Sequence, residues 1–165
     1  MNRKTDSKIV ERNIAVEKCA NARDDGKNIV FTNGCFDILH RGHIEYLETA
    51  RSFGDMLMIG LNTDASVKRL KNTGRPVNSE EDRARVLAAL ECVDLICLFD
   101  EDTPAELIEA VRPHMLVKGA EYNVEEIAGH KTILADGGEV RTIEMVEGKS
   151  TTSLIQKIKE LPDQV

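Results

Sequence analysis

Two of the four histidines in the sequence lie three residues apart, in the segment His40-Arg41-Gly42-His43. Residues at this spacing point the same way on a helical turn. The glycine between them lets a bulky anion approach the backbone. N–H groups at the start of a helix, together with the helix dipole, favour phosphate. Two imidazoles in this place could donate hydrogen bonds to the oxygens of a phosphate group during its transfer.

The histidine pair could also have no part in phosphate chemistry. Histidines most often lie at the surface or in a core without any chemical role. Zinc binding is disfavoured because the sequence has only four histidines and no third ligand at metal spacing. The segment 32–43 also lacks both the G-x-G-x-x-G and the Walker A patterns. The position of the pair in the expected fold therefore decides its interpretation.

Short apolar runs rich in β-formers alternate with helical patterns along the chain. We expect strands over 29–32, 56–61, 93–99, 115–117 and 139–146. We expect helices over 7–23, 43–53 and 79–90, after Asp102-Thr103-Pro104, and from Ser150 or Thr151; a polar connection fills 62–78.

This alternation predicts an α/β fold of the Rossmann-like, doubly wound class, with a mostly parallel five-stranded sheet and helices on both faces. Ligands in such folds bind beyond the carboxyl ends of the strands, where the strand order reverses. The histidine pair follows the first expected strand, so it lies where the fold predicts a ligand.

The composition is that of an ordinary globular protein, with 165 residues, 41% hydrophobic and 31% charged. We expect a single globular domain overall, made of a helical extension over 1–28 and the main domain over 29–165. The net charge of −7 disfavours nucleic acid as a partner. No apolar run reaches the roughly 20 residues that span a membrane. The first residues do not resemble a secretory signal, so we expect a cytoplasmic protein. The four cysteines form no C-x-x-C pair and are expected to be reduced thiols.

Two signatures resemble the cytidylyltransferase-like nucleotidyltransferase superfamily. Residues 34–37 followed by 40–43 resemble its G-x-F-D…H-x-G-H signature, and residues 147–152, Glu-Gly-Lys-Ser-Thr-Thr, are similar to its E-G-I-S-T-T. Shorter likenesses lie at 62–64, 75–76, 81–83 and 117–119, so the resemblance covers about 29–161. Within the superfamily, the runs 32–43, 61–71, 74–78 and 99–104 resemble most closely the heptose 1-phosphate adenylyltransferases.

That resemblance implies transfer of AMP from ATP to D-glycero-D-manno-heptose 1-phosphate, giving ADP-heptose and pyrophosphate for the lipopolysaccharide core. It also implies Mg²⁺ bound with ATP and a homodimer or higher homo-oligomer. In many bacteria this activity is fused to a sugar kinase, for which this sequence has no room, so a stand-alone form is expected. The alternatives are a glycerol-3-phosphate cytidylyltransferase, another H-x-G-H transferase, or a non-catalytic nucleotide-binding module. Met145 stands where the cytidylyltransferases have arginine, a loss that Lys149 partly compensates.

The resemblance also assigns roles to individual residues. The expected catalytic residues are His40, His43, Lys68, Lys71 and Arg83. The expected nucleotide-binding residues are Thr32, Asn33, Gly34, Cys35, Phe36, Asp37, Gly42, Lys118, Gly119, Glu121, Ser150, Thr151 and Thr152, and no metal ligand is expected. Alternatives remain open for some of them. Asp37 could have a purely structural role in the turn, and Lys68 or Lys71 could belong to a solvated basic face. Arg75 is a further candidate for binding the sugar phosphate.

Overall fold

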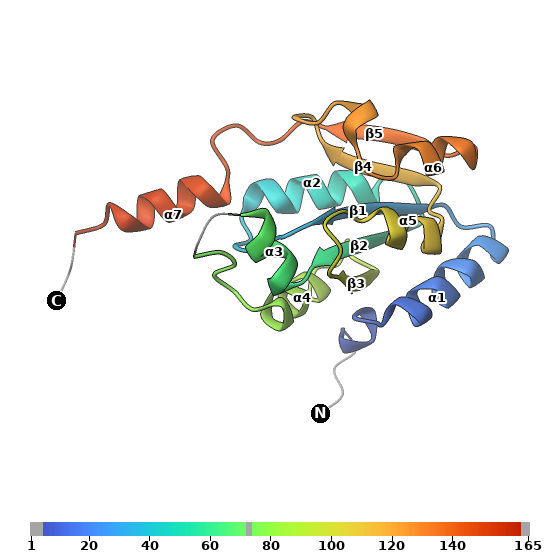
Figure 1. The fold of residues 1–165 in the computed structure, drawn as a ribbon, viewed down its shortest axis with the longest axis horizontal. Helices are drawn as coiled ribbons and strands as arrows, with labels where there is room; N and C mark the ends of the chain where they lie inside the picture. The colour runs from blue at the N-terminus through green and yellow to red at the C-terminus, as the bar shows by residue number, and fades with distance from the viewer. Residues whose placement is uncertain (1–4, 72–73, 163–165) are drawn as a thin grey trace.

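The computed structural model describes residues 5–71 and 74–162, and its centre is a sheet of five strands. These are β1 (Ile29–Gly34), β2 (Met56–Asn62), β3 (Leu95–Phe99), β4 (Met115–Gly119) and β5 (Glu139–Ile143), in the order β3-β2-β1-β4-β5 (Figure 1). Every pairing within the sheet is parallel. The strand order reverses between β1 and β4. The expected doubly wound, five-stranded fold is therefore confirmed, with all strands parallel rather than most of them.

Helices cover both faces of this sheet, as expected (Figure 1). The helices are α1 (Arg12–Asp24), α2 (Arg41–Arg51), α3 (Asp64–Leu70), α4 (Glu80–Ala88), α5 (Ala105–Val111), α6 (His130–Ala135) and α7 (Thr151–Lys159). Two 3₁₀ turns lie at Asp6–Lys8 and Val124–Glu126. One face packs against α1, α5 and α6, and the other against α2 and α4.

Alternation along each strand divides the core into two layers. Ile29 and Phe31 of β1 face the layer that contains Ala15 and Cys19 of α1. Val30, between them in sequence, faces the other layer with α2 and α4. Ala15 and Cys19 are fully buried. The helix that the sequence sets apart as an extension thus supplies one side of the core.

Two short helices were not expected from the sequence. The polar connection expected over 62–78 contains the helix α3. Its start is capped by the Thr63 hydroxyl, which accepts a hydrogen bond from the Ser66 N–H at 3.1 Å. Seven residues with few apolar positions are too short to show helical periodicity. The short helix α6 was missed for the same reason.

Candidate functional site

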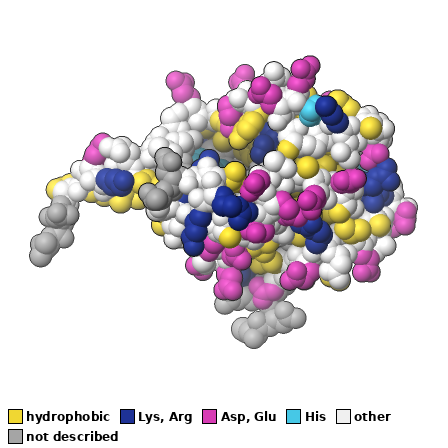
Figure 2. Space-filling model, viewed as in Figure 1, with side chains coloured by type: hydrophobic (Ala, Val, Ile, Leu, Met, Phe, Trp, Pro, Cys, Tyr) yellow, Lys and Arg dark blue, Asp and Glu magenta, His cyan; other side chains and the backbone are white. Residues whose placement is uncertain are grey.

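A cavity of about 610 Å³ opens at the carboxyl ends of the strands. Its walls come from the loop after β1, the start of α2, the end of β4 and the start of α7. In Figure 2, α7 projects from the body of the molecule at the left. The cavity lies where the sequence predicted a ligand, because β1 and β4 part at the reversal of strand order.

Side chains bridge β1 and β4 just beyond the end of their hydrogen-bonded ladder. The ladder ends at the pair Phe31 and Leu116. The buried Tyr46 hydroxyl then donates to the Val117 carbonyl at 3.1 Å and lies 2.7 Å from the Thr32 hydroxyl, which therefore donates to it. Thr32 does not line the cavity, so its side chain contacts this bridge instead of a nucleotide.

Lys118 forms a second bridge between the same two strands. Its Nζ donates to the Asn33 backbone oxygen and to Asn33 Oδ1, each at 3.1 Å. The ammonium also lies 4.9 Å from the centre of the Tyr122 ring. Burial lowers the pKa of Lys118 to about 8, although Glu121 and Cys35 act in the opposite direction. Both Lys118 and Asn33 line the cavity, so this bridge forms part of its wall.

His40 and His43 both line the cavity and stack on each other. Their ring centroids are 3.9 Å apart at an interplanar angle of 24°, and the Phe36 ring meets His43 edge-on at 5.4 Å. Neither Nδ1 atom has a hydrogen-bond partner within the described part of the chain. The first turn of α2 therefore presents the two rings as a single unit.

Burial keeps both imidazoles neutral at physiological pH. Burial, and then the neighbouring His40, lower the pKa of His43 to about 4. Burial, and then the Lys149 ammonium, lower the pKa of His40. A neutral imidazole carries one N–H and one bare nitrogen. Each ring can therefore donate one hydrogen bond without first losing or gaining a proton.

Gly42 makes room for side chains rather than for an anion. A Cβ at this position would lie 3.0 Å from His40 Cε1 and 3.2 Å from Lys149 Cβ. Gly42 is buried and does not line the cavity. The space that was expected to admit a ligand is thus filled by the chain itself.

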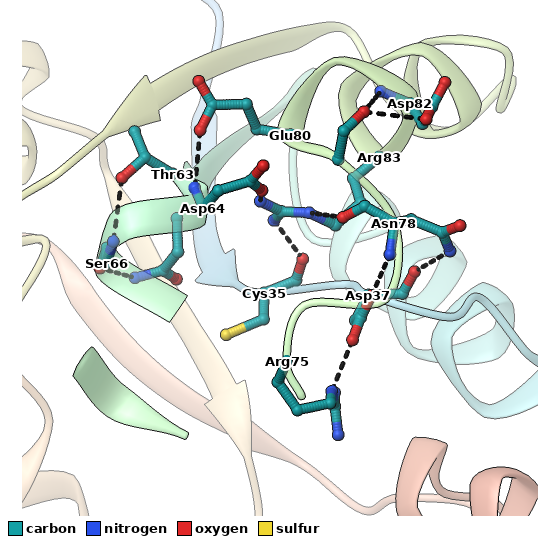
Figure 3. A network of polar contacts seen from close by, with 12 residues as sticks. Cys35, Asp37, Thr63, Asp64, Ser66, Arg75, Asn78, Glu80, Asp82 and Arg83 are labelled. Atoms are coloured by element: carbon teal, nitrogen blue, oxygen red, sulfur yellow. Dashed lines mark hydrogen bonds and ion pairs between the residues drawn. The ribbon is translucent and has the colours of Figure 1, made fainter. Parts of the chain in front are cut away.

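Asp37 is buried and connects the loop after β1 to residues 75–78. Its carboxylate accepts hydrogen bonds from the backbone N–H groups of Val77 and Asn78 and from Arg75 Nε (Figure 3). Burial alone would raise the pKa of Asp37, but these bonds lower it. The contacts agree with the structural role that the sequence left open. They also occupy Arg75, the further candidate for the sugar phosphate.

Arg83 supports the same loop from behind, with a fully buried side chain. It donates to the Cys35 carbonyl at 2.7 Å, to the Asn78 carbonyl at 3.1 Å and to Asp64 Oδ1 at 2.7 Å (Figure 3). Arg83 does not line the cavity, so its guanidinium braces the loop where a phosphate contact was expected. Lys68, exposed on α3, is also outside the cavity wall.

Most of the other predicted site residues meet at the cavity. They are Gly34, Cys35, Phe36, Lys71, Gly119, Glu121, Ser150, Thr151 and Thr152. The Ser150 hydroxyl caps α7 by accepting from the Ser153 N–H at 3.0 Å. The Glu121 carboxylate packs against Gly119, since a Cβ there would lie 2.1 Å from Oε2.

Several residues of the cavity wall were not expected from the sequence. Tyr46 lies three residues after His43 on α2, so helical spacing could have pointed to it. Lys149 stands inside one of the two signatures and was expected only to compensate in part for the arginine that Met145 replaces, not to contact the histidine pair. Asn62 belongs to the likeness at 62–64, but no contact with the site was assigned to it, and Glu126 carries no local signal, because only the fold brings it to the cavity.

Comparison with known proteins identifies the family. The family model described as "Cytidylyltransferase-like" matches residues 31–157, which is most of the chain. The chain belongs to this family. The expected resemblance is confirmed, and the match includes the histidine pair, the Arg75 loop and the start of α7.

Individual relatives of this cytidylyltransferase-like chain are longer. It is 50% identical over 159 residues to the Bifunctional protein HldE of Trichlorobacter lovleyi, covering 96% of this chain and 32% of that protein. It is 55% identical over 139 residues to the Bifunctional protein HldE of Pseudomonas aeruginosa, covering 84% of this chain and 29% of that protein. The chain therefore spans about a third of the length of these curated relatives.

A solved structure is also similar. The lipopolysaccharide core biosynthesis protein from Thermoplasma volcanium GSS1 superposes with a TM-score of 0.61 at 26% identity. The match covers 75% of this chain and all of the other.

The described residues contain neither a cluster of metal ligands nor a membrane-spanning helix. No three or more His, Cys, Asp or Glu side chains in 5–71 and 74–162 are grouped so that they could hold a metal ion. Within the same residues, no helix is both long and apolar enough to cross a bilayer.

Proposed function

We propose that this chain is a nucleotidyltransferase that transfers AMP from ATP to D-glycero-D-manno-heptose 1-phosphate, giving ADP-heptose and pyrophosphate. The observation that carries the proposal is the pair of stacked imidazoles in a cavity at the split between β1 and β4. Such a pair supplies hydrogen-bond donors in a fixed place, which is what a transferring phosphate group needs.

The proposed reaction is one direct displacement at the α-phosphorus of ATP. An oxygen of the sugar phosphate forms the new P–O bond while the bond to the β-phosphate oxygen breaks and its electron pair leaves with pyrophosphate. Such chemistry depends mainly on positioning and charge stabilisation. His40 and His43 donate to triphosphate oxygens, and the backbone around Cys35 and Phe36 lies against them. Cys35 is not a nucleophile in this scheme, and burial raises the pKa of its thiol.

The sugar phosphate and the nucleotide are inferred from resemblance. The runs 32–43, 61–71, 74–78 and 99–104 resemble heptose 1-phosphate adenylyltransferases. The relatives at about half identity are called bifunctional, which agrees with an activity that is fused to another in some proteins. The similar solved structure belongs to a lipopolysaccharide core biosynthesis protein. We accordingly place the product in the synthesis of that glycan, in the cytoplasm where ATP is available.

We also propose that Mg²⁺ enters with ATP rather than in a site made by the protein. The donor set does not fit a protein-held ion, because the described residues contain no suitable acidic cluster and the Asp37 carboxylate is occupied by Arg75 and two backbone N–H groups. Triphosphate oxygens and water would then provide the ligands. A homodimer or higher homo-oligomer remains a prediction of the family resemblance.

A pyrophosphate-release assay tests the proposal. The purified chain is given ATP, CTP or GTP with either heptose 1-phosphate or glycerol 3-phosphate. We expect release only with ATP and heptose 1-phosphate, and ADP-heptose identified by mass spectrometry. Activity confined to CTP and glycerol 3-phosphate would instead identify a glycerol-phosphate cytidylyltransferase. No release of pyrophosphate with any combination of triphosphate and acceptor would indicate a nucleotide-binding module without catalysis.

A further inference from the structure

Lys149 reaches the histidine pair from a distant part of the sequence. It lies immediately before Ser150, the residue that caps α7, and its side chain packs against the first turn of α2. A Cβ on Gly42 would lie 3.2 Å from Lys149 Cβ and 3.1 Å from His40 Nδ1. The absence of a side chain on Gly42 is therefore what allows Lys149 and the His40 ring to share one surface of the cavity.

Within the described part of the chain, the ammonium of Lys149 has no partner, and neither has that of Lys71, whereas two other cations of the cavity wall are paired. Arg75 pairs with Asp37 at 2.5 Å, and Lys118 donates twice to Asn33. Within residues 5–71 and 74–162, Lys149 has neither an ion pair nor a side-chain hydrogen bond, and it lines the cavity beside His40 and His43. An uncompensated cation next to two neutral donors makes this wall attractive to an anion.

The same ammonium acts on the ring beside it. Lys149 adds to burial in lowering the pKa of His40. A second titratable group that faces His40 is His43, whose ring stacks on it. A positive charge disfavours protonation of a neighbouring imidazole. Lys149 thus helps to keep His40 a neutral donor while supplying the positive charge itself.

We propose that Lys149 binds the triphosphate of the nucleotide, as the cation that completes the imidazole pair. This assignment rests on the proposed nucleotidyltransferase function. The leaving pyrophosphate gains negative charge as its bond to the α-phosphorus breaks, and an ammonium held against the same wall stabilises that charge. The positive charge for this wall comes from the connection between β5 and α7, and the hydrogen-bond donors come from α2.

The first test measures nucleotide affinity without any acceptor. Isothermal titration with α,β-methylene-ATP and Mg²⁺ compares the wild type with Lys149→Met, Lys149→Arg and the control Lys157→Met. Lys157 is exposed on α7 and does not line the cavity. We expect Lys149→Met to weaken binding by roughly ten- to a hundredfold, the range for a lost charged hydrogen bond. Lys149→Arg, which keeps the charge, should retain most of the affinity, and Lys157→Met should bind like the wild type.

The second test measures the effect on His40 directly. An NMR titration of the His40 ring should give a higher pKa in Lys149→Met than in the wild type, because a nearby positive charge has been removed. Lys157→Met should leave this pKa unchanged. An affinity for α,β-methylene-ATP that is equal in Lys149→Met and the wild type would overturn the proposal, as would a wild type that does not bind it.

The two proposals fail in different ways. Tight binding of α,β-methylene-ATP that depends on Lys149, without formation of ADP-heptose, would remove the proposed function and keep this inference. Formation of ADP-heptose at the wild-type rate by Lys149→Met would keep the proposed function and remove this inference.

Discussion

The residues that matter most for the proposed chemistry are neutral because of where they lie. An exposed histidine titrates near pH 6.5, but burial and His40 lower the pKa of His43 to about 4. The ring then stays a neutral hydrogen-bond donor throughout the physiological range. A charged imidazole in the same place would carry a large desolvation cost before any substrate arrived. The positive charge comes instead from Lys149, which is exposed to solvent.

Replacement of His43 tests its role as a donor. We expect His43→Ala to lower turnover by roughly a hundredfold or more, as loss of a transition-state hydrogen-bond donor does elsewhere. Steady-state kinetics measure this, and circular dichroism checks that the fold is kept. Glu48→Ala, an exposed change on the same helix, is the matched control and should be fully active. Near-normal turnover of His43→Ala would remove the residue from the mechanism.

The lowered pKa of His43 also predicts how stability depends on pH. The unfolded chain binds a proton at this residue near pH 6.5, and the folded chain only near pH 4. Because the unfolded chain binds this proton more tightly, protons favour unfolding. The free energy of unfolding that the neutral His43 contributes is therefore fully present above pH 6.5 and is lost as the pH falls toward 4. Urea unfolding at several pH values should show that the free energy of unfolding falls less between pH 6.5 and 4 in His43→Gln than in the wild type. Equal pH dependence in the two proteins would contradict the assigned burial.

At the scale of elements, the cavity is held open by contacts behind it. Tyr46 from α2 bridges β1 and β4 just after their ladder ends. Arg83 from α4 holds the Cys35 carbonyl, and Asp37 holds the loop that carries Arg75 (Figure 3). These groups fix the loop after β1, so that loop can meet a nucleotide without reorganising.

Asp37 gives a direct test of this support. Asp37→Asn keeps the shape of the side chain but loses the charge that accepts from Arg75 and two backbone N–H groups. We expect a loss of about 2–4 kcal/mol in the free energy of unfolding, as for other broken buried ion pairs. Thermal and urea unfolding measure it. Asp82→Asn, whose contact with Ser79 is exposed, should cost less than about 1 kcal/mol. If both variants unfold alike, Asp37 does not anchor the loop.

At the scale of the whole molecule, the N-terminal helix and the cavity belong to one folded unit. α1 covers the face of the sheet opposite α2, and its buried residues join Phe31 and Leu107 in one apolar layer. Removal of that cover would expose the strands whose far ends form the site. Helix α7, unlike α1, contributes no buried residue to the core, and apolar side chains lie exposed along it (Figure 2).

A matched pair of variants in α1 tests this view. Ala15→Asp puts a charge at a fully buried position and should lower the free energy of unfolding by more than about 3 kcal/mol. Asn13→Asp adds the same charge at an exposed position of the same helix and should change little. Chemical unfolding compares the two proteins. If Ala15→Asp were as stable as the wild type, the packing of residues 1–28 would not contribute to the stability of the domain.

The sequence alone determined the succession along the chain of the five strands and five of the helices, and the place of the histidine pair after β1, because these depend on local patterns and short spacings. It did not determine the seven-residue helix α3, whose formation rests on the Thr63 cap more than on periodicity. Only the tertiary structure decided that Arg83 braces the Cys35 carbonyl and that Lys149 lies against Gly42. Contacts between residues so far apart in the chain depend on how complete elements pack, and no local pattern encodes that packing.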